Sequence, residues 1–280
     1  MVLVILGLGT SIDYMSIEAL RHLSRADIVF LETYTSIAPG INYNLLKKIV
    51  KGEIRFTTRR ELEEAGGEPI LSEARNKYVV LAVAGDPMIA TTHVNLVIAA
   101  AKKNIEYIIV PGLSGIQASI SLSGLQVYKF GRITTLTYPE EHYKPYTTIK
   151  VIRENIERGL HTLVLLDIRY DEGRAMSIKE ASRILVELEE EYCLNPENNC
   201  SPILSDTIGV GIARAGSREA VVRADLIKRL SLHEYPPPPH SIIVVGSLHP
   251  VELEALVFHG KLPLEYIRDN PRYSRILKYI

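Results

Sequence analysis

The fold of this chain is decided by the stretch Leu81-Ala82-Val83-Ala84-Gly85-Asp86-Pro87-Met88-Ile89-Ala90-Thr91-Thr92-His93. An apolar run rich in Val and Ala ends abruptly at Gly85-Asp86-Pro87, and a helical pattern begins only after Thr91-Thr92. The pattern predicts a buried strand that opens into a tight loop, with one carboxylate beside a rigid proline. Because ligands of α/β proteins bind beyond the carboxyl ends of strands, Asp86 is a candidate ligand-binding residue. The alternative is an ordinary strand-to-helix turn, since Gly, Asp and Pro are common turn residues.

The segments around this stretch alternate between strand and helix patterns. Apolar runs of strand length predict buried strands at residues 2–6, 28–31, 54–57, 78–83 and 105–110. Apolar residues at helical spacing predict helices at residues 16–25, 43–50, 71–76 and 92–103. Strands that alternate with helices are typical of a mainly parallel sheet, so we expect an α/β domain in the first part of the chain.

The pattern changes where Pro111-Gly112-Leu113-Ser114-Gly115 interrupts the alternation. Beyond it, strand patterns occupy residues 133–137, 161–167, 207–213, 219–223 and 241–245, and helix patterns occupy residues 116–122, 147–158, 177–191 and 224–230. Two of these strands flank Arg214-Ala215-Gly216-Ser217-Arg218 and predict a hairpin. We therefore expect two domains, residues 1–112 and residues 113–280, with a mixed α/β sheet in the second.

Composition limits the class of protein. The chain has 280 residues, of which 46% are hydrophobic and 23% charged, as in a globular protein. Its net charge of −1 gives no indication of direct nucleic-acid binding or of a membrane surface as partner. No apolar run approaches the ~20 residues of a membrane span. Met1–Gly7 resembles a first buried strand and not a signal peptide, and the tail beyond Gly260 is expected to pack on the surface.

The residues that most often bind metals are sparse and scattered. The two cysteines, Cys193 and Cys200, have no nearby histidine or third cysteine at a zinc-type spacing, so no metal site is expected. They could close a small disulfide loop or remain free thiols. No pair among the eight histidines has the spacing of a metal-binding helix. His240 stands out because four prolines, Pro236–Pro239, form a stiff extended segment that leads into it.

A glycine-rich turn follows the first predicted strand. Gly7-Leu8-Gly9-Thr10 matches the start of a dinucleotide-binding fingerprint, but Ile12 occupies the place of its third glycine. Glu32 could supply the acidic residue that such a site needs. A nicotinamide-dependent oxidoreductase is therefore one alternative, and a turn that lets another ligand approach the backbone is the other. The chain has neither a phosphate-binding loop nor a serine-hydrolase elbow.

Several segments, taken together and in order, resemble one family. They are Gly7-Leu8-Gly9, Glu32–Ser36, Gly85–His93, Gly124–Gly131, Tyr138-Pro139-Glu140, Arg158–Leu163, Ala213–Ser217 and Pro238-Pro239-His240. Gly-Asp-Pro marks only a superfamily, whereas Ala90-Thr91-Thr92-His93, Tyr128-Lys129-Phe130-Gly131 and Ala213–Ser217 are more specific. The chain resembles the diphthine synthase family, archaeal type, of the tetrapyrrole-methylase superfamily from Met1 to about Leu256.

The resemblance implies a cytoplasmic methyltransferase that uses S-adenosyl-L-methionine. Its substrate would be a histidine of translation elongation factor 2 that carries a 3-carboxy-3-aminopropyl arm. The arm's amine would be methylated, in the archaeal type to the trimethylammonium form, in diphthamide biosynthesis. The implied fold has two α/β domains with the cofactor in a cleft between them, and the implied assembly is a homodimer.

The resemblance also implies a cofactor site, although it names no catalytic base. The residues at matching positions are Thr10, Asp86, Ile89, Gly115, Ile116, Leu166, Ala215 and His240. Backbone groups at residues 85–89 and 115–116 would hold the cofactor, apolar side chains would flank its adenine, and Asp86 would orient its polar groups or favour its sulfonium.

Three departures from the family pattern accompany this site. Thr10 stands where the family usually has Leu, and residues 195–201 look like an insertion. Residues 111–116 are one residue longer than usual, so Ser114 and Gly115 compete for one position.

Other readings remain open at this point. A relative acting on a corrinoid precursor would lack Ala90–His93 and Tyr128–Gly131, and a relative acting on ribosomal RNA is disfavoured by the net charge of −1. The oxidoreductase suggested by Gly7–Thr10 would bind NAD in place of S-adenosyl-homocysteine. A non-enzymatic scaffold would have no saturable small-ligand binding.

Overall fold

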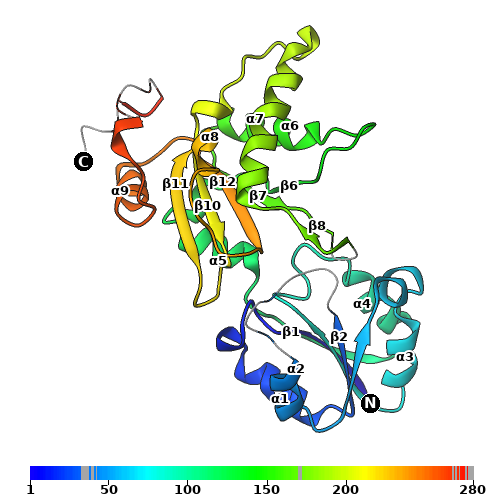
Figure 1. Ribbon diagram of the computed structural model, residues 1–280. Helices are drawn as coiled ribbons and strands as arrows, with labels where there is room; N and C mark the ends of the chain where they lie inside the picture. The colour runs from blue at the N-terminus through cyan, green and yellow to red at the C-terminus, as the bar shows by residue number, and fades with distance from the viewer. Residues whose placement is uncertain are drawn as a thin grey trace. The chain divides into compact units, whose positions relative to one another are not determined.

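The computed structural model describes residues 1–32, 38, 41, 43–169, 172–266, 268, 270, 272–274 and 276. The chain divides into two compact units, Met1–Gln117 and Ala118–Ile280 (Figure 1). The domain boundary that we place after Gly112 stays a prediction. Residues 33–36 of the family-like segment Glu32–Ser36 lie outside the described residues.

The first unit is built on a five-stranded parallel sheet. Its strand order is β3-β2-β4-β1-β5. The strands are β1 (Val2–Gly7), β2 (Ile28–Glu32), β3 (Glu53–Thr57), β4 (Tyr78–Val83) and β5 (Glu106–Val110). Since β1 and β4 are central neighbours, their carboxyl ends, Gly7 and Val83, lie in register at one edge of the sheet. The sequence-based prediction of a parallel α/β sheet is confirmed.

Helices cover both faces of this sheet. They are α1 (Ile17–Arg25), α2 (Tyr43–Ile49), α3 (Glu68–Ala74) and α4 (Val94–Lys102), with short helical turns η1 (Ile12–Tyr14) and η2 (Arg60–Glu64), the latter a π-helix. Side chains alternate along a strand, so Leu3 and Ile5 of β1 pack with α3 and α4. Val4 and Leu6 pack with α1 and α2 on the other face.

The second unit contains a mixed five-stranded sheet in the order β11-β10-β12-β7-β6. The strands are β6 (Thr134–Leu136), β7 (Thr162–Leu166), β10 (Ile208–Ala213), β11 (Val221–Leu226) and β12 (His240–Val244). Only β6 and β7 are parallel; the other neighbours are antiparallel, and β10 and β11 form the predicted hairpin. A separate two-stranded ribbon joins β8 (Ile168–Arg169) to β9 (Arg174–Ala175). The mixed sheet confirms the expectation for this part of the chain.

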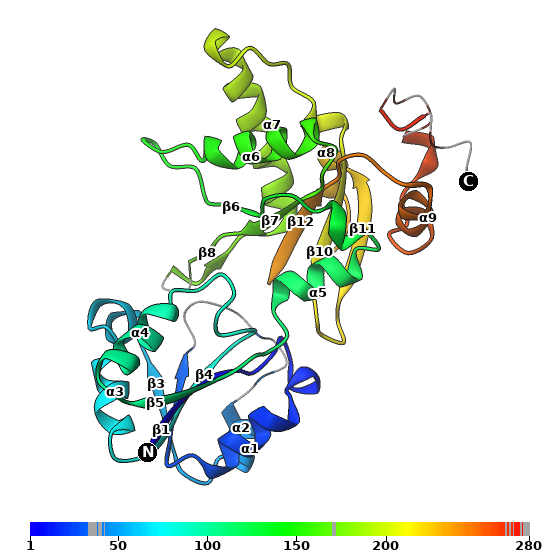
Figure 2. The same cartoon turned by 180° about the vertical axis from the view of Figure 1, so that it is seen from behind.

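Helices also lie on both faces of the second sheet. They are α5 (Gly115–Leu122), α6 (Tyr146–Glu157), α7 (Ile178–Leu194), α8 (Ile227–Leu230) and α9 (Pro250–Phe258), with 3₁₀ turns η3 (Val127–Lys129), η5 (Pro196–Asn198), η6 (Leu204–Asp206) and η7 (Leu264–Tyr266). α7 begins at a capping box of Ser177 and Glu180. α6 and α7 pack on the face that contains Ile242, and α5 lies on the opposite face (Figure 2). There the hydroxyls of Ser119 in α5 and Ser241 in β12 are 3.0 Å apart.

Two expectations from the sequence are wrong in detail, and one helix was not predicted. Residues 224–226 extend β11 and do not begin a helix, because they continue the ladder with β10 until Leu226 pairs with Ile208. α9 was not predicted, since its residues are apolar almost throughout and show no amphipathic period. The tail does not lie wholly on the surface: Tyr273 is 2% exposed, and its hydroxyl accepts a hydrogen bond from the Ile208 amide.

The cysteines form a disulfide, which answers the question that the sequence left open. Cys193, in the last turn of α7, is bonded to Cys200, with their Cα atoms 5.2 Å apart. Beyond it, the amides of Ile203 and Leu204 donate to the buried Glu189 carboxylate of α7. Among the helices in the described parts of the chain, none combines the length and apolar character needed to cross a bilayer.

Candidate functional site

Three glycines pack backbone against backbone where β1, β4 and β5 end. A Cβ atom on Gly7 would lie 2.5 Å from the Gly85 carbonyl oxygen and 2.7 Å from the Gly112 amide nitrogen. Real Cβ atoms essentially never approach other atoms so closely, so only glycine fits here. Gly85 and Gly9 exchange two backbone hydrogen bonds, of 2.9 and 3.0 Å. The glycines thus tie together the loops that follow the two central strands.

Asp86 organises the loop after β4. Its Oδ1 accepts hydrogen bonds from the amides of Met88, at 2.8 Å, and Ile89, at 3.1 Å. Its Oδ2 accepts one from the Gly112 amide, at 3.1 Å. The side chain is 9% exposed. Both carboxylate oxygens are therefore bonded within the first unit, and one of these bonds joins the loop after β4 to the loop after β5.

The Pro87 carbonyl fixes the rest of this loop. It accepts hydrogen bonds from the Thr91 hydroxyl and from His93 Nδ1, both at 2.8 Å. Ala90, which lies between Pro87 and Thr91 in this loop, has a φ of +56°, a left-handed conformation that few residues other than glycine adopt. Ile89 is 36% exposed, an unusually open position for a large aliphatic side chain in so constrained a loop.

The residues before and within the first turn of α5 form a second loop at the same edge of the sheet. The Ser114 hydroxyl accepts a hydrogen bond from the Ile116 amide, and the Ser114 amide donates to Gln117 Oε1. A Cβ built on Gly115 meets nothing within 4 Å, and one on Gly85 meets only atoms at 3.9 Å. The backbone at Gly115 therefore borders open space, and a Cβ at Gly85 would make only ordinary van der Waals contacts with Leu113 and Ser114.

Thr10 lies in the turn after β1, next to Gly9, which is hydrogen-bonded to Gly85. It follows Gly9, whose φ of +73° makes the tight turn after β1. Thr10 is half-buried, and the neighbouring Ser11 is 3% exposed. The Ser11 hydroxyl has no hydrogen-bond partner among the described residues. The loop after β1 thus carries a buried polar group whose bonding the described protein atoms do not satisfy.

The remaining predicted residues gather at one edge of the second sheet. Ala213, at the end of β10, pairs with His240, at the start of β12, and the next residue of β12, Ser241, pairs with Leu165 of β7. Leu166, which ends β7, is therefore close to His240 in the ladder. Ala215 is half-buried in the loop after β10. The sheet brings Leu166, Ala215 and His240 to a common edge.

The His240 side chain is fully used within this unit. Its Nδ1 accepts a hydrogen bond from the Ile178 amide at 3.1 Å, and its Nε2 donates to the Pro236 carbonyl at 2.7 Å. This pattern requires the neutral Nε2–H tautomer. Burial lowers the pKa of His240, and the bond to Pro236 opposes that shift. The imidazole therefore fixes the proline segment to α7 and has no nitrogen left for a ligand.

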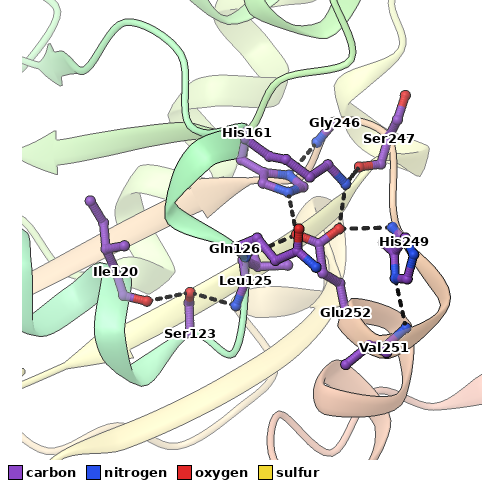
Figure 3. Close-up of polar contacts among 11 residues, drawn as sticks. Ile120, Ser123, Leu125, Gln126, His161, Gly246, Ser247, His249, Val251 and Glu252 are labelled. Atoms are coloured by element: carbon purple, nitrogen blue, oxygen red, sulfur yellow. Dashed lines mark hydrogen bonds and ion pairs between the residues drawn. The ribbon is translucent and has the colours of Figure 1, made fainter.

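A buried carboxylate in α9 secures the family-like segment Gly124–Gly131 (Figure 3). Glu252 accepts hydrogen bonds from the Gln126 amide at 2.9 Å and from His161 Nε2 at 3.1 Å. It also pairs with Lys129 and accepts the His249 amide. Burial acts to raise the pKa of Glu252, but these hydrogen bonds outweigh it and bring the pKa to about 2. The carboxylate is thus ionised and holds α9 against the segment around η3.

Sequence reasoning missed this cluster. Lys129 appeared only as part of a motif, His161 as one of several scattered histidines, and Glu252 was not singled out. The motif Gly124–Gly131 was the available signal, because a lysine within a family-specific segment suggests an ion pair with a carboxylate elsewhere in the chain. The described residues contain no group of three or more side chains placed to bind a metal ion.

The structure thus places the predicted cofactor residues in two groups. Asp86, Ile89, Gly115 and Ile116 lie in loops at the carboxyl edge of the first sheet, with Thr10 in the turn after β1. Leu166, Ala215 and His240 form the group in the second unit. The amides of residues 88, 89 and 116, expected from the sequence to bind a cofactor, instead donate to side chains in their own loops.

Known proteins resemble the chain along nearly its whole length. Residues 2–200 match the family of tetrapyrrole (corrin/porphyrin) methylases. A diphthine synthase from Staphylothermus marinus is 40% identical over 271 residues, which are 96% of this chain and 96% of that protein. One from Methanocaldococcus jannaschii is 38% identical, over 91% of this chain and 98% of its own.

Solved structures agree with these relatives. A crystal structure of a diphthine synthase superposes with a TM-score of 0.83 at 30% identity, covering 96% of this chain and 99% of the other. A conserved hypothetical protein from Aeropyrum pernix K1 superposes with a TM-score of 0.86 at 29% identity, covering 100% and 98%. The chain therefore belongs to the tetrapyrrole (corrin/porphyrin) methylase family and, within it, to the diphthine synthases, a group of methyltransferases.

Proposed function

We propose that this enzyme transfers methyl groups from S-adenosyl-L-methionine to an amine on translation elongation factor 2. The amine belongs to the 3-carboxy-3-aminopropyl arm of a modified histidine, and the product is diphthine in its trimethylammonium form. The observation that carries this proposal is the 40% identity to a diphthine synthase over 96% of both chains. Cytoplasmic location and a homodimer are part of the same proposal.

The open backbone in the first unit suits a flat, polar cofactor. A Cβ atom on Gly115 would project into space that the protein leaves free, and one on Gly85 would meet other atoms only at 3.9 Å. Ile116 follows Gly115, Ile89 lies in the same loop as Gly85, and both offer apolar surface for an adenine ring. Because the amides of residues 88, 89 and 116 are occupied, we assign the cofactor's polar contacts in these loops to carbonyl oxygens.

The same proposal assigns cofactor contacts to Thr10 and Asp86 in the first unit and to Leu166, Ala215 and His240 in the second. Asp86 acts by shaping its loop, since its oxygens already accept three backbone amides. His240 acts through its backbone and its fixed position, because both ring nitrogens are bonded.

When bound, S-adenosyl-L-methionine supplies an electrophilic methyl group on a sulfonium sulfur. The enzyme's own task is alignment, because the amine must reach a near-attack distance of roughly 3–3.5 Å. The amine must also be neutral, and an unperturbed α-amino group with a pKa of about 8 is mostly protonated near neutral pH. The chain must therefore position the arm, exclude water and accept a proton.

Two measurements test the proposal. Calorimetry with S-adenosyl-homocysteine should show saturable binding, and NAD should show none. With labelled cofactor, elongation factor 2 bearing the aminocarboxypropyl arm should become labelled, whereas the unmodified factor should not. Binding of NAD alone would favour the oxidoreductase alternative. Labelling of a corrinoid precursor in place of the factor would assign the enzyme to another branch of its family.

A further inference from the structure

A small pocket of about 110 Å³ opens in the first unit beside the loop that contains Asp86. It lies between η2, which follows β3, and the start of α4, which follows β4, so it is at the carboxyl edge of the sheet. Its walls include Leu62, Glu63, Thr92, His93, Asn95 and Leu96. A water needs roughly 10–15 Å³ on this measure, so the pocket admits a short polar side chain but not a whole nucleoside cofactor.

His93 is the unusual member of this wall. Its side chain is 3% exposed, and its Nδ1 is 2.8 Å from the Pro87 carbonyl oxygen. Since a carbonyl only accepts hydrogen bonds, Nδ1 carries a proton, and the neutral ring has its lone pair on Nε2. In the described part of the chain, Nε2 has no hydrogen-bond partner. His93 lines the pocket, so a ring nitrogen without a protein partner is available there to a ligand.

The pocket has an acidic side and a side that favours anions. Glu63 of η2 contributes a carboxylate, 3.7 Å from the Arg59 guanidinium. The opposite side is the start of α4, where His93 is the N-cap residue but makes no capping bond through its side chain, and where Asn95 offers an amide. A helix N-terminus favours negative charge. Together these groups suit a molecule whose ammonium and carboxylate are attached to the same carbon atom.

The other charged groups near His93 are already engaged. The Asp86 carboxylate accepts three backbone amides. The residues that α3 packs on this face of the sheet, Ile70, Leu71 and Ala74, are apolar. Glu63, which is paired with Arg59, is therefore the charged side chain in the pocket lining.

We propose that this pocket receives the amino and carboxylate ends of the substrate arm and that His93 Nε2 is the base for its amine. The inference rests on the proposed function. In the step, one N–H bond of the ammonium breaks and its electron pair stays on the amine nitrogen. The proton bonds to Nε2, which gives an imidazolium and a neutral, nucleophilic amine. No oxidant or reductant takes part, and water later removes the proton from His93.

Binding to the pocket is tested without elongation factor 2. The probe is 2-aminobutyrate, which carries the same ammonium and carboxylate on one carbon, titrated into ¹⁵N-histidine-labelled enzyme. We expect the Nε2 resonance of His93 to shift saturably, and butyrate or propylamine to shift it at least ten-fold more weakly. No shift with 2-aminobutyrate, or equal shifts with all three probes, would overturn the pocket assignment.

Two substitutions of His93 separate catalysis from structure. In His93→Asn the amide nitrogen replaces Nδ1 and keeps the bond to Pro87, whereas in His93→Gln an amide replaces Nε2. Both variants should bind S-adenosyl-homocysteine as the natural enzyme does, but methylate at least 100-fold more slowly, the scale of a lost general base. His142→Asn, at an exposed position, is the control.

The outcomes distinguish this inference from the proposed function. If the natural enzyme methylates modified elongation factor 2 and His93→Asn retains its rate, the role of His93 is wrong and the function stands. If the natural enzyme methylates no form of the factor, the function is wrong, and the 2-aminobutyrate titration still decides whether the pocket binds an amino acid group.

Discussion

Replacement of Asp86 tests whether this carboxylate acts by shaping its loop. Its two oxygens accept amides from Met88, Ile89 and Gly112, at 2.8, 3.1 and 3.1 Å. Asp86→Ala removes all three acceptors and leaves the amides unsatisfied in a mostly buried place. Asp86→Asn keeps an oxygen for Met88 and Ile89 but turns an amide group toward the Gly112 N–H, so it removes only the bond between the two loops.

The magnitude follows from these contacts. A hydrogen bond to a charged group contributes about 1.5–3 kcal/mol, and loss of a capping acceptor costs about 1 kcal/mol. With two of the three bonds at 3.1 Å, we expect Asp86→Ala to lower the free energy of unfolding by about 3–5 kcal/mol. Asp86→Asn should lower it by about 1–2 kcal/mol, since one bond is lost.

Urea unfolding followed by circular dichroism measures both changes, and calorimetry with S-adenosyl-homocysteine measures cofactor binding. We expect affinity to fall in the same order as stability, with Ala worse than Asn. Unchanged unfolding midpoints in both variants would refute the loop-shaping role. Loss of binding in Asp86→Asn with full stability would instead show that the negative charge itself contacts the cofactor.

Four further variants probe other parts of the fold. Gly7→Ala places a Cβ 2.5 Å from a carbonyl oxygen and should lower the free energy of unfolding by about 1–3 kcal/mol in urea unfolding. A Cβ on Gly115 meets no atom within 4 Å, so Gly115→Ala should unfold as the natural protein does. The same variant should bind S-adenosyl-homocysteine more weakly in calorimetry. Glu252 has a pKa of about 2 against a usual 4.5, so it contributes stability above pH 4.5 that is lost as the pH falls toward 2. Glu252→Gln should therefore reduce the difference in unfolding free energy between pH 7 and pH 3 by about 2 kcal/mol, and an unchanged difference would contradict this. The double variant Cys193→Ser/Cys200→Ser lacks the disulfide and should lose about 2–3 kcal/mol of unfolding free energy. Urea unfolding with and without reductant measures this loss, and reductant should destabilise only the natural protein.

The sequence predicted those elements whose type is set by neighbouring residues along the chain. β4 and its loop were recognisable because an apolar run stops at Gly85-Asp86-Pro87, and α7 because Ser177 begins a helical period. The end of β11 was misassigned because residues 224–226 are compatible with either structure. Their pairing with β10, a contact between separate strands, decides the matter.

The cofactor site stays a prediction, and its local hydrogen bonding could not be predicted from the sequence. The resemblance to a family pointed to Asp86 and His240, yet it did not show that both side chains are bonded to partners from other segments. For His240 that partner is the Ile178 amide, 62 residues away. The Glu252 cluster was missed for the same reason, because His161 lies 91 residues from its carboxylate partner. Sequence spacing carries no signal for hydrogen bonds of this range.

The central claim is that this enzyme methylates the aminocarboxypropyl arm of elongation factor 2. Intact-mass spectrometry of the modified factor, incubated with enzyme and S-adenosyl-L-methionine, tests it most directly. We predict mass increments that accumulate to three methyl groups on the modified histidine, with the unmodified factor unchanged. An unchanged mass of the modified factor, or equal increments on both forms, would contradict the account.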